Sequence, residues 1–188
     1  MSSAVNPSLD TSPNPSLNPP VQPSVIRPNA RFMLSHPAHC IALGFGSGLS
    51  PAAPGTAGTL WAWVAYAVLQ MWLTPMQIGI VIAASLAIGL WACTVTASHM
   101  RVLDPGAIVW DEVVAFRIIL WLVMPAGFMA QLVAFMLFRI FDAVKPGPVA
   151  WADNLFHDFG WKGGFGILFD DLVAAFCTLL VIAMWRAW

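Results

Sequence analysis

The chain has 188 residues, of which 59% are hydrophobic and only 9% are charged. A soluble domain has charge on about a quarter of its positions, so this composition excludes an ordinary water-soluble globule and indicates an integral membrane protein. The formal net charge of -1 leaves no basic excess for binding nucleic acid, and three cysteines without paired spacing argue against a disulfide framework or a structural zinc site.

The amino-terminal part, residues 1–35, is rich in proline and serine. Its first thirty residues contain no aromatic residue, so they cannot bury enough apolar surface to offset the entropy of ordering. We expect a flexible tail there, and a membrane-embedded domain over residues 36–188.

A stretch rich in glycine and proline follows the tail, GFGSGLSPAAPGTAGTL at 44–60. It predicts a loop that opens into a helix, and the exposed backbone N–H groups of such a loop can receive a phosphate. Ser47, Gly48 and Thr56 are therefore candidate substrate-binding residues. The alternative is that the small residues serve close helix packing in lipid.

Long apolar segments make up most of the remaining chain. No Asp, Glu, Lys or Arg occurs between Arg31 and Arg101, which leaves room for two membrane spans of about 20 residues each. Backbone amides in lipid must be satisfied within their own segment, so we predict an all-α fold, a polytopic bundle of about four to five hydrophobic helices. The predicted spans are 57–73, 76–96, 107–124, 128–141 and 167–185. The first two are expected to form an antiparallel hairpin.

The distribution of cations predicts the orientation, because Lys and Arg are retained on the cytoplasmic side. All of the following fall on one side if the amino terminus is cytoplasmic: Arg27, Arg31, Arg101, Arg139, Lys145 and Lys162. Arg186 alone lies at the far end. Aromatic and charged residues alternate over 151–162, which predicts a segment lying in the interface on the cytoplasmic side.

Two acidic pairs are the main candidates for chemistry. Asp111 and Glu112 occupy the expected opening turn of the third span, and Asp170 and Asp171 that of the fifth. An ionisable group in a span costs on the order of 2.5–3.5 kcal/mol, which makes it a functional candidate. Four carboxylates at one depth repel each other unless a cation lies between them, and hard oxygen ligands suit Mg²⁺ or Mn²⁺. Helix capping and interfacial anchoring is the alternative reading.

A third group of charges has Arg139, Asp142 and Lys145 spaced three apart, so the three share a helical face. Two cations on either side of a carboxylate are typical of a phosphate clamp next to a metal ligand, since Arg binds oxyanions through two N–H groups and Lys acts as a point charge. An interfacial salt bridge with snorkelling side chains is the alternative.

The other polar residues in the apolar region give weaker signals. We interpret His36, His39, His99 and His157 as interfacial or loop residues, because they are scattered along the chain. Arg117 is not spaced three or four residues from Asp111 or Glu112, so its expected partner lies on another helix.

Taken together, four motifs resemble the phosphatidylglycerophosphatase A family of bacterial membrane enzymes. They are the glycine-rich stretch 44–60, IVWDE at 108–112, FRIFDAVKPGPV at 138–149 and GFGILFDDLVA at 164–174. The resemblance implies Mg²⁺-dependent hydrolysis of phosphatidylglycerophosphate to phosphatidylglycerol and phosphate, by a multi-pass protein of the bacterial inner membrane with its active site facing the cytoplasm. The substrate partner is a membrane phospholipid.

We combine the two lines of reasoning in one hypothesis for the site. The residues expected to hold one or two Mg²⁺ ions are Asp111, Glu112, Asp142, Asp170 and Asp171, of which all but Asp170 are also candidate catalytic residues. Arg139 and Lys145 are expected to stabilise charge on the phosphoryl oxygens.

Two other classes of protein remain as alternatives. A small transporter or channel with an acidic ion site also places carboxylates in spans, but here the charges cluster near one face rather than at the bilayer midplane. A noncatalytic assembly subunit has little reason to keep four polar motifs. Phosphate release from a lipid phosphate monoester separates all three classes.

Overall fold

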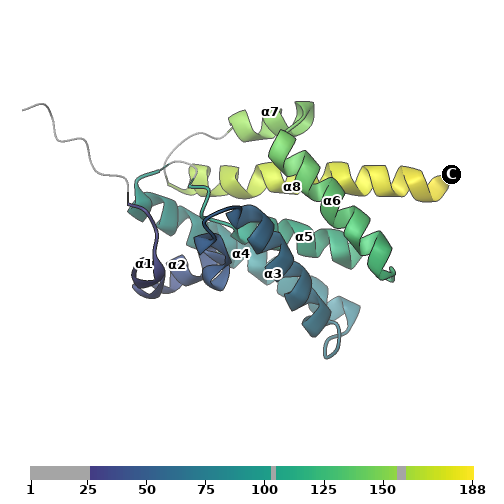
Figure 1. Cartoon of the computed structure of the whole chain (residues 1–188), viewed down its shortest axis with the longest axis horizontal. Helices are drawn as coiled ribbons and strands as arrows, with labels where there is room; N and C mark the ends of the chain where they lie inside the picture. Colours follow the sequence, from purple (N-terminus) through teal and green to yellow (C-terminus); the bar gives the residue numbers. More distant parts are fainter. Residues whose placement is uncertain (1–25, 103–104, 156–159) are drawn as a thin grey trace, which may run out of the picture.

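The computed structural model describes residues 26–102, 105–155 and 160–188, and over these residues it is helical with no strand (Figure 1). The all-α prediction is therefore confirmed. Most of the predicted tail, as well as Asp104, His157 and Asp158, lies outside the described residues. The elements are α1 (Ala30–Leu34), α2 (Pro37–Ala42), η1 (Gly44–Leu49), α3 (Pro54–Leu69), α4 (Pro75–Met100), α5 (Trp110–Val123), α6 (Phe128–Val144), α7 (Gly147–Leu155) and α8 (Trp161–Ala187).

Each apolar segment predicted as a span coincides largely with one of the helices α3, α4, α5, α6 and α8. Among the described residues, two of these helices, α4 and α8, are long and apolar enough to cross a membrane. Each is more than 25 residues long, and at 1.5 Å per residue that length exceeds the hydrocarbon core of a bilayer, about 30 Å. α1 is a single short turn that lies wholly within the predicted tail 1–35, so residues 30–34 are helical and the flexible tail predicted for them is wrong.

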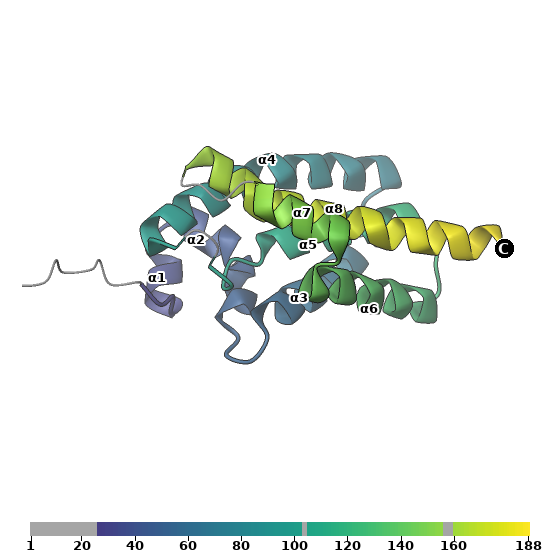
Figure 2. The ribbon, with the colours of Figure 1, turned by 90° about the horizontal axis from the view of Figure 1, so that it is seen from above.

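The central helix of the bundle is α5. Its side chains Val113, Phe116 and Ile119 are fully buried, and it packs against α3, α4 and α8. Figure 2 shows α4 on one side of the molecule and α3 with α6 on the other, with α5 and α8 between them. The core therefore lies around α5.

The predicted hairpin of α3 and α4 differs from the structure in its packing. A tight turn does connect the two helices, and Thr74 begins α4 with a capping box in which its side chain and that of Gln77 bind each other's backbone N–H. From this turn, however, the helices diverge, and α5 lies between them (Figure 2). The physical reason is that α3 buries its small residues, such as Gly58 and Ala62, against α5 rather than α4.

Helix α8 begins earlier than the expected span at 167–185. It starts at Trp161, so Asp170 and Asp171 lie well inside the helix and not in its opening turn. The glycines near the start of α8 allow a close approach to α4, because a Cβ on Gly164 would lie 2.9 Å from Thr94 Cβ of α4. α8 can therefore continue past these glycines against α4.

The three described histidines, scattered in the sequence, meet where α1 and α2 pack on the end of α4. His39 Nδ1 donates to the carbonyl of Phe32 at 2.9 Å, and its Nε2 lies 2.8 Å from His99 Nδ1. The His36 ring lies 5.3 Å from that of His39. Burial lowers the pKa of His39, which favours the neutral ring that this arrangement needs. The histidines thus attach the amino-terminal helices to α4.

We expect Gly164→Ala to lower the free energy of unfolding by about 1–3 kcal/mol, because the added Cβ overlaps Thr94 and must push α8 away from α4. Gly127→Ala is the matched control, since nothing lies within 4 Å of a Cβ at that position. Thermal unfolding of both variants in detergent measures the difference. Equal unfolding midpoints would show that the α4–α8 contact is not close.

Candidate active site

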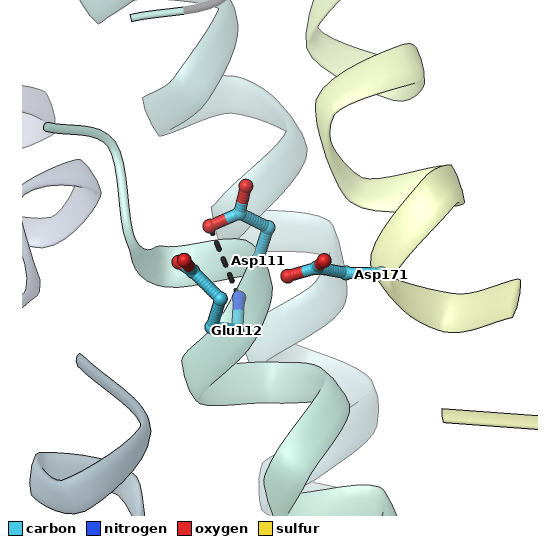
Figure 3. A group of neighbouring side chains, drawn as sticks. All are labelled: Asp111, Glu112 and Asp171. Carbon is cyan, nitrogen blue, oxygen red and sulfur yellow. Dashed lines mark hydrogen bonds between the residues drawn. The ribbon is translucent and has the colours of Figure 1, made fainter. Parts of the chain in front are cut away.

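Three carboxylates from two helices converge in the interior. Asp111 and Glu112 belong to the first turn of α5, and Asp171 comes from α8 (Figure 3). One oxygen of each lies within 4.8 Å of the other two. Asp111 Oδ1 also accepts the backbone N–H of Glu112 at 3.0 Å, which holds the first carboxylate at the start of the helix. The structure therefore brings together one member of the second acidic pair with both members of the first.

The oxygens of this cluster fit a divalent cation. Asp171 is only 3% exposed, and its Oδ2 has no hydrogen-bond partner among the described residues. Glu112 Oε2 is buried without a partner in the same way. A buried carboxylate oxygen is costly unless it is paired or coordinates a metal, and a set of oxygen donors suits a hard ion such as Mg²⁺ or Mn²⁺.

Helix α6 adds Arg139 and Asp142 to the edge of the cluster. Arg139 Nη1 lies 2.5 Å from Asp142 Oδ2 and 3.7 Å from Glu112 Oε1. Asp142 is close enough to Glu112 and Asp171 to repel both electrostatically. The carboxylate and the guanidinium that the sequence placed on one face of this helix thus lie beside the three converging carboxylates.

Lys145 and Asp170 belong to a second ion cluster. Asp170 Oδ2 accepts a hydrogen bond from Lys145 Nζ at 2.8 Å, and Lys145 also binds Asp153 of α7. Burial lowers the pKa of Lys145, but its bonds to Asp153 and Asp170 raise it by more, so the net shift is above its usual value and the amine stays protonated. Asp153, which the sequence analysis did not single out, links α7 to this cluster.

The predicted clamp of two cations around Asp142 is therefore divided between the two clusters. Lys145 ends α6 in the left-handed conformation, with φ 45°, so it leaves the helical face shared by Arg139 and Asp142. On α8, consecutive side chains point about 100° apart, so Asp170 faces Lys145 while Asp171 faces α5. Spacing along each helix alone did not reveal this division.

The glycine-rich loop contributes mainly its last part to the site. Ser47 Oγ donates to the carbonyl of Gly44 at 2.9 Å, and the N–H of Gly48 donates to the carbonyl of Leu43 at 3.0 Å. Both residues therefore stabilise the loop itself. Gly55, in the first turn of α3, lies against the acidic cluster. A Cβ there would overlap Glu112 Oε1 and lie 3.1 Å from Arg139 Nη1.

The start of α3 offers backbone donors at this place. The first hydrogen bond of the helix runs from Ala57 N to the carbonyl of Ala53, so the N–H groups of Gly55 and Thr56 precede it. Ala53, the N-cap residue, provides no side-chain cap. Helix amino termini of this kind attract anions, and Arg139 lies next to this one. The sequence analysis did not identify Gly55 as a site residue, because a glycine that follows a proline is also common at the start of helices that bind no ligand.

Arg117 lies away from these charges. Its guanidinium carbon is 5.8 Å from the centre of the Trp110 ring, which is two turns earlier on α5. Among the described residues Arg117 forms no ion pair with another helix, and the ring of Trp110 on its own helix lies beside the cation.

Comparison with known proteins identifies the family. The phosphatidylglycerophosphatase A family model matches residues 40–186. The chain is 39% identical to phosphatidylglycerophosphatase A of Escherichia coli, over 77% of this chain and 81% of the relative. It is 36% identical to phosphatidylglycerophosphatase A of Haemophilus influenzae, over 86% and 96%.

A Bacteroides thetaiotaomicron protein named as a candidate phosphatidylinositol-3-phosphatase is 38% identical over 78% of this chain and 91% of its own length. No solved structure matches the chain significantly. The family match extends over all the helices that supply the two ion clusters, from η1 to α8. The chain therefore belongs to the phosphatidylglycerophosphatase A family.

Proposed function

We propose that the protein hydrolyses the terminal phosphate monoester of phosphatidylglycerophosphate, giving phosphatidylglycerol and inorganic phosphate in bacterial phospholipid synthesis. The observation that supports this most directly is the buried cluster of Asp111, Glu112 and Asp171 beside Arg139 and the start of α3. Such a site combines oxygen ligands for a cation with donors for a phosphate. The names of two relatives supply the substrate.

Asp111, Glu112 and Asp171 would hold a Mg²⁺ ion, and Asp142 lies near enough to join them. A bound divalent cation supplies Lewis acidity, which neutralises charge on the phosphoryl group and makes a water easier to deprotonate. Asp170 keeps its bond to Lys145, so its contribution is to hold α6 and α7 against α8. In this arrangement Lys145 positions Asp170 and does not bind the phosphate directly. Its positive charge attracts the phosphate only from a distance.

The chain's own residues account for the remaining parts of the reaction. Arg139 and the N–H groups of Gly55 and Thr56 bind the phosphoryl oxygens. Of the predicted substrate-binding residues, Arg139 and Thr56 keep that role in this proposal, whereas Ser47 and Gly48 shape the loop and Lys145 holds Asp170. The oxygen of water bonds to phosphorus while the bond from phosphorus to the glycerol oxygen breaks. A carboxylate of the cluster accepts the proton of the water, and the glycerol oxygen takes up a proton as it leaves.

We also propose that residues 36–188 form a multi-pass domain in the bacterial inner membrane, preceded by a tail over 1–35. In this arrangement α3, α5 and α6 cross the bilayer together with α4 and α8. The active site then faces the cytoplasm, where Arg101, Arg139, Lys145 and Lys162 lie according to the positive-inside rule. α7 lies in the interface beside the site.

Replacing Asp111 or Asp171 by Asn is expected to lower phosphate release from phosphatidylglycerophosphate at least about 100-fold, because a ligand and potential base is lost. Asp10→Asn, outside the region matched by the family model, is the control and should keep the wild-type rate. Phosphatidylinositol-3-phosphate serves as the comparison substrate, since one relative is named as a candidate phosphatidylinositol-3-phosphatase. A transporter would release no phosphate from either lipid.

We expect a chelator to abolish activity of the purified wild-type protein and added Mg²⁺ to restore it. Mg²⁺ should also raise the midpoint of thermal unfolding of the wild type, because an ion bound only by the folded state stabilises it. The midpoint of Asp171→Asn should not respond. Full activity in excess chelator would exclude an ion from the reaction.

Gly55→Ala tests the approach of α3 to the carboxylates. The new Cβ overlaps the flexible end of Glu112, so the chain should fold with nearly unchanged stability while Glu112 and Arg139 are displaced. We expect phosphate release to fall about 10- to 100-fold. Gly106→Ala, where a Cβ meets nothing within 4 Å, should behave as the wild type. Equal rates for the two variants would place the reaction away from α3.

A further inference from the structure

A groove lies at the end of the molecule opposite the acidic cluster. It is lined by residues of α6, including Met129 and Val133, by the last turns of α8, and by Val123 of α5. It encloses about 380 Å³, within the range of about 300–1,000 Å³ that is usual for small-molecule sites. Figure 1 shows α6 crossing α8 obliquely, so that the amino-terminal part of α6 and the carboxyl-terminal part of α8 diverge from the crossing.

The side chains of this groove are apolar except for Arg186. Neither residues 118–138 nor residues 172–185 contain an Asp, Glu, Lys or Arg, so these segments supply no acidic side chain to the groove. Arg186 Nη2 donates to the carbonyl of Val123 at 3.0 Å, and both residues line the groove. The side chain is exposed, and a guanidinium has five N–H donors, so others remain for a ligand.

The end of α8 also has the composition of a helix that reaches a membrane surface. Trp185 lines the groove and is 82% exposed, and Trp188 follows it. Tryptophan is enriched at the level of lipid headgroups, and an arginine there can bind a lipid phosphate. The apolar groove suits an acyl chain, and Arg186 at the level of the headgroups suits an anionic head. Both features together match an anionic lipid.

We propose that this groove binds an anionic phospholipid of the leaflet opposite the active site. One acyl chain lies between α6 and α8, and the lipid phosphate binds Arg186. The proposal rests on α8 crossing the membrane but not on the proposed hydrolysis, which takes place at the other end of the bundle. It therefore assigns the protein a second lipid site, distinct from the site where the phosphate monoester is cleaved.

The test is a titration of the full-length protein in detergent, followed by native mass spectrometry, with dioleoylphosphatidylglycerol and dioleoylphosphatidylcholine as probes. The wild type should retain the anionic lipid about fivefold more strongly, the effect of about one basic side chain at a membrane surface. Arg186→Gln should lose this preference, and Arg186→Lys, which keeps the charge, should retain it. Ala130→Trp, which fills the groove, should weaken retention of both lipids.

Lys162→Gln is the matched control, because it removes one positive charge from the first turn of the same helix. It should keep the preference for the anionic lipid. The proposal is overturned if Arg186→Gln keeps the preference, if Lys162→Gln loses it to the same extent, or if only Asp171→Asn loses it. The last result would assign the retained lipid to the phosphatase site. Phosphate release, measured separately, reports on that site alone.

Discussion

The convergence of Asp111, Glu112 and Asp171 places three like charges within a few ångströms of one another in a largely buried region. Such carboxylates repel each other unless they take up protons or share a cation. The packing of α5 on α8 must offset this repulsion, and both helices have buried apolar side chains, Val113 on α5 and Ala174 on α8 among them. An ion bound between the carboxylates would remove the repulsion, so the proposed cofactor would stabilise the fold as well as take part in the reaction.

The remaining charges near the cluster are separated by helix geometry. Asp170 and Asp171 are consecutive in the chain but face different neighbours, so one binds Lys145 and the other joins the carboxylates of α5. Lys145 thereby connects the end of α6 to α7 and to α8, while Arg139 remains beside Glu112. The two cations of this sequence motif thus have different surroundings. Lys145 lies among the helices that it holds together, and Arg139 lies at the edge of the acidic cluster.

Glycines determine how closely the helices around the site approach each other. At Gly164 the absence of a side chain brings α8 against Thr94 of α4, and at Gly58 it brings α3 within reach of Val109 at the start of α5. Gly58 fits the alternative of close helix packing that the sequence left open for the stretch 44–60, and Gly164 serves the same purpose on α8. Gly55 differs, because the space that it leaves is filled by the ends of Glu112 and Arg139. The same residue type therefore serves packing at two positions and borders the candidate site at a third.

The sequence by itself determined the helical class, the places of the long helices and the small set of charged residues from which a site could be built. It could do so because an apolar run in lipid has one way to satisfy its backbone, and because few charges occur in such runs. Only the tertiary structure decided that Asp171 rather than Asp170 joins Asp111, that Lys145 binds Asp153, and that α5 separates α3 from α4. Those contacts join residues of different helices, and they depend on how each helix is rotated against its neighbours, which local spacing does not specify.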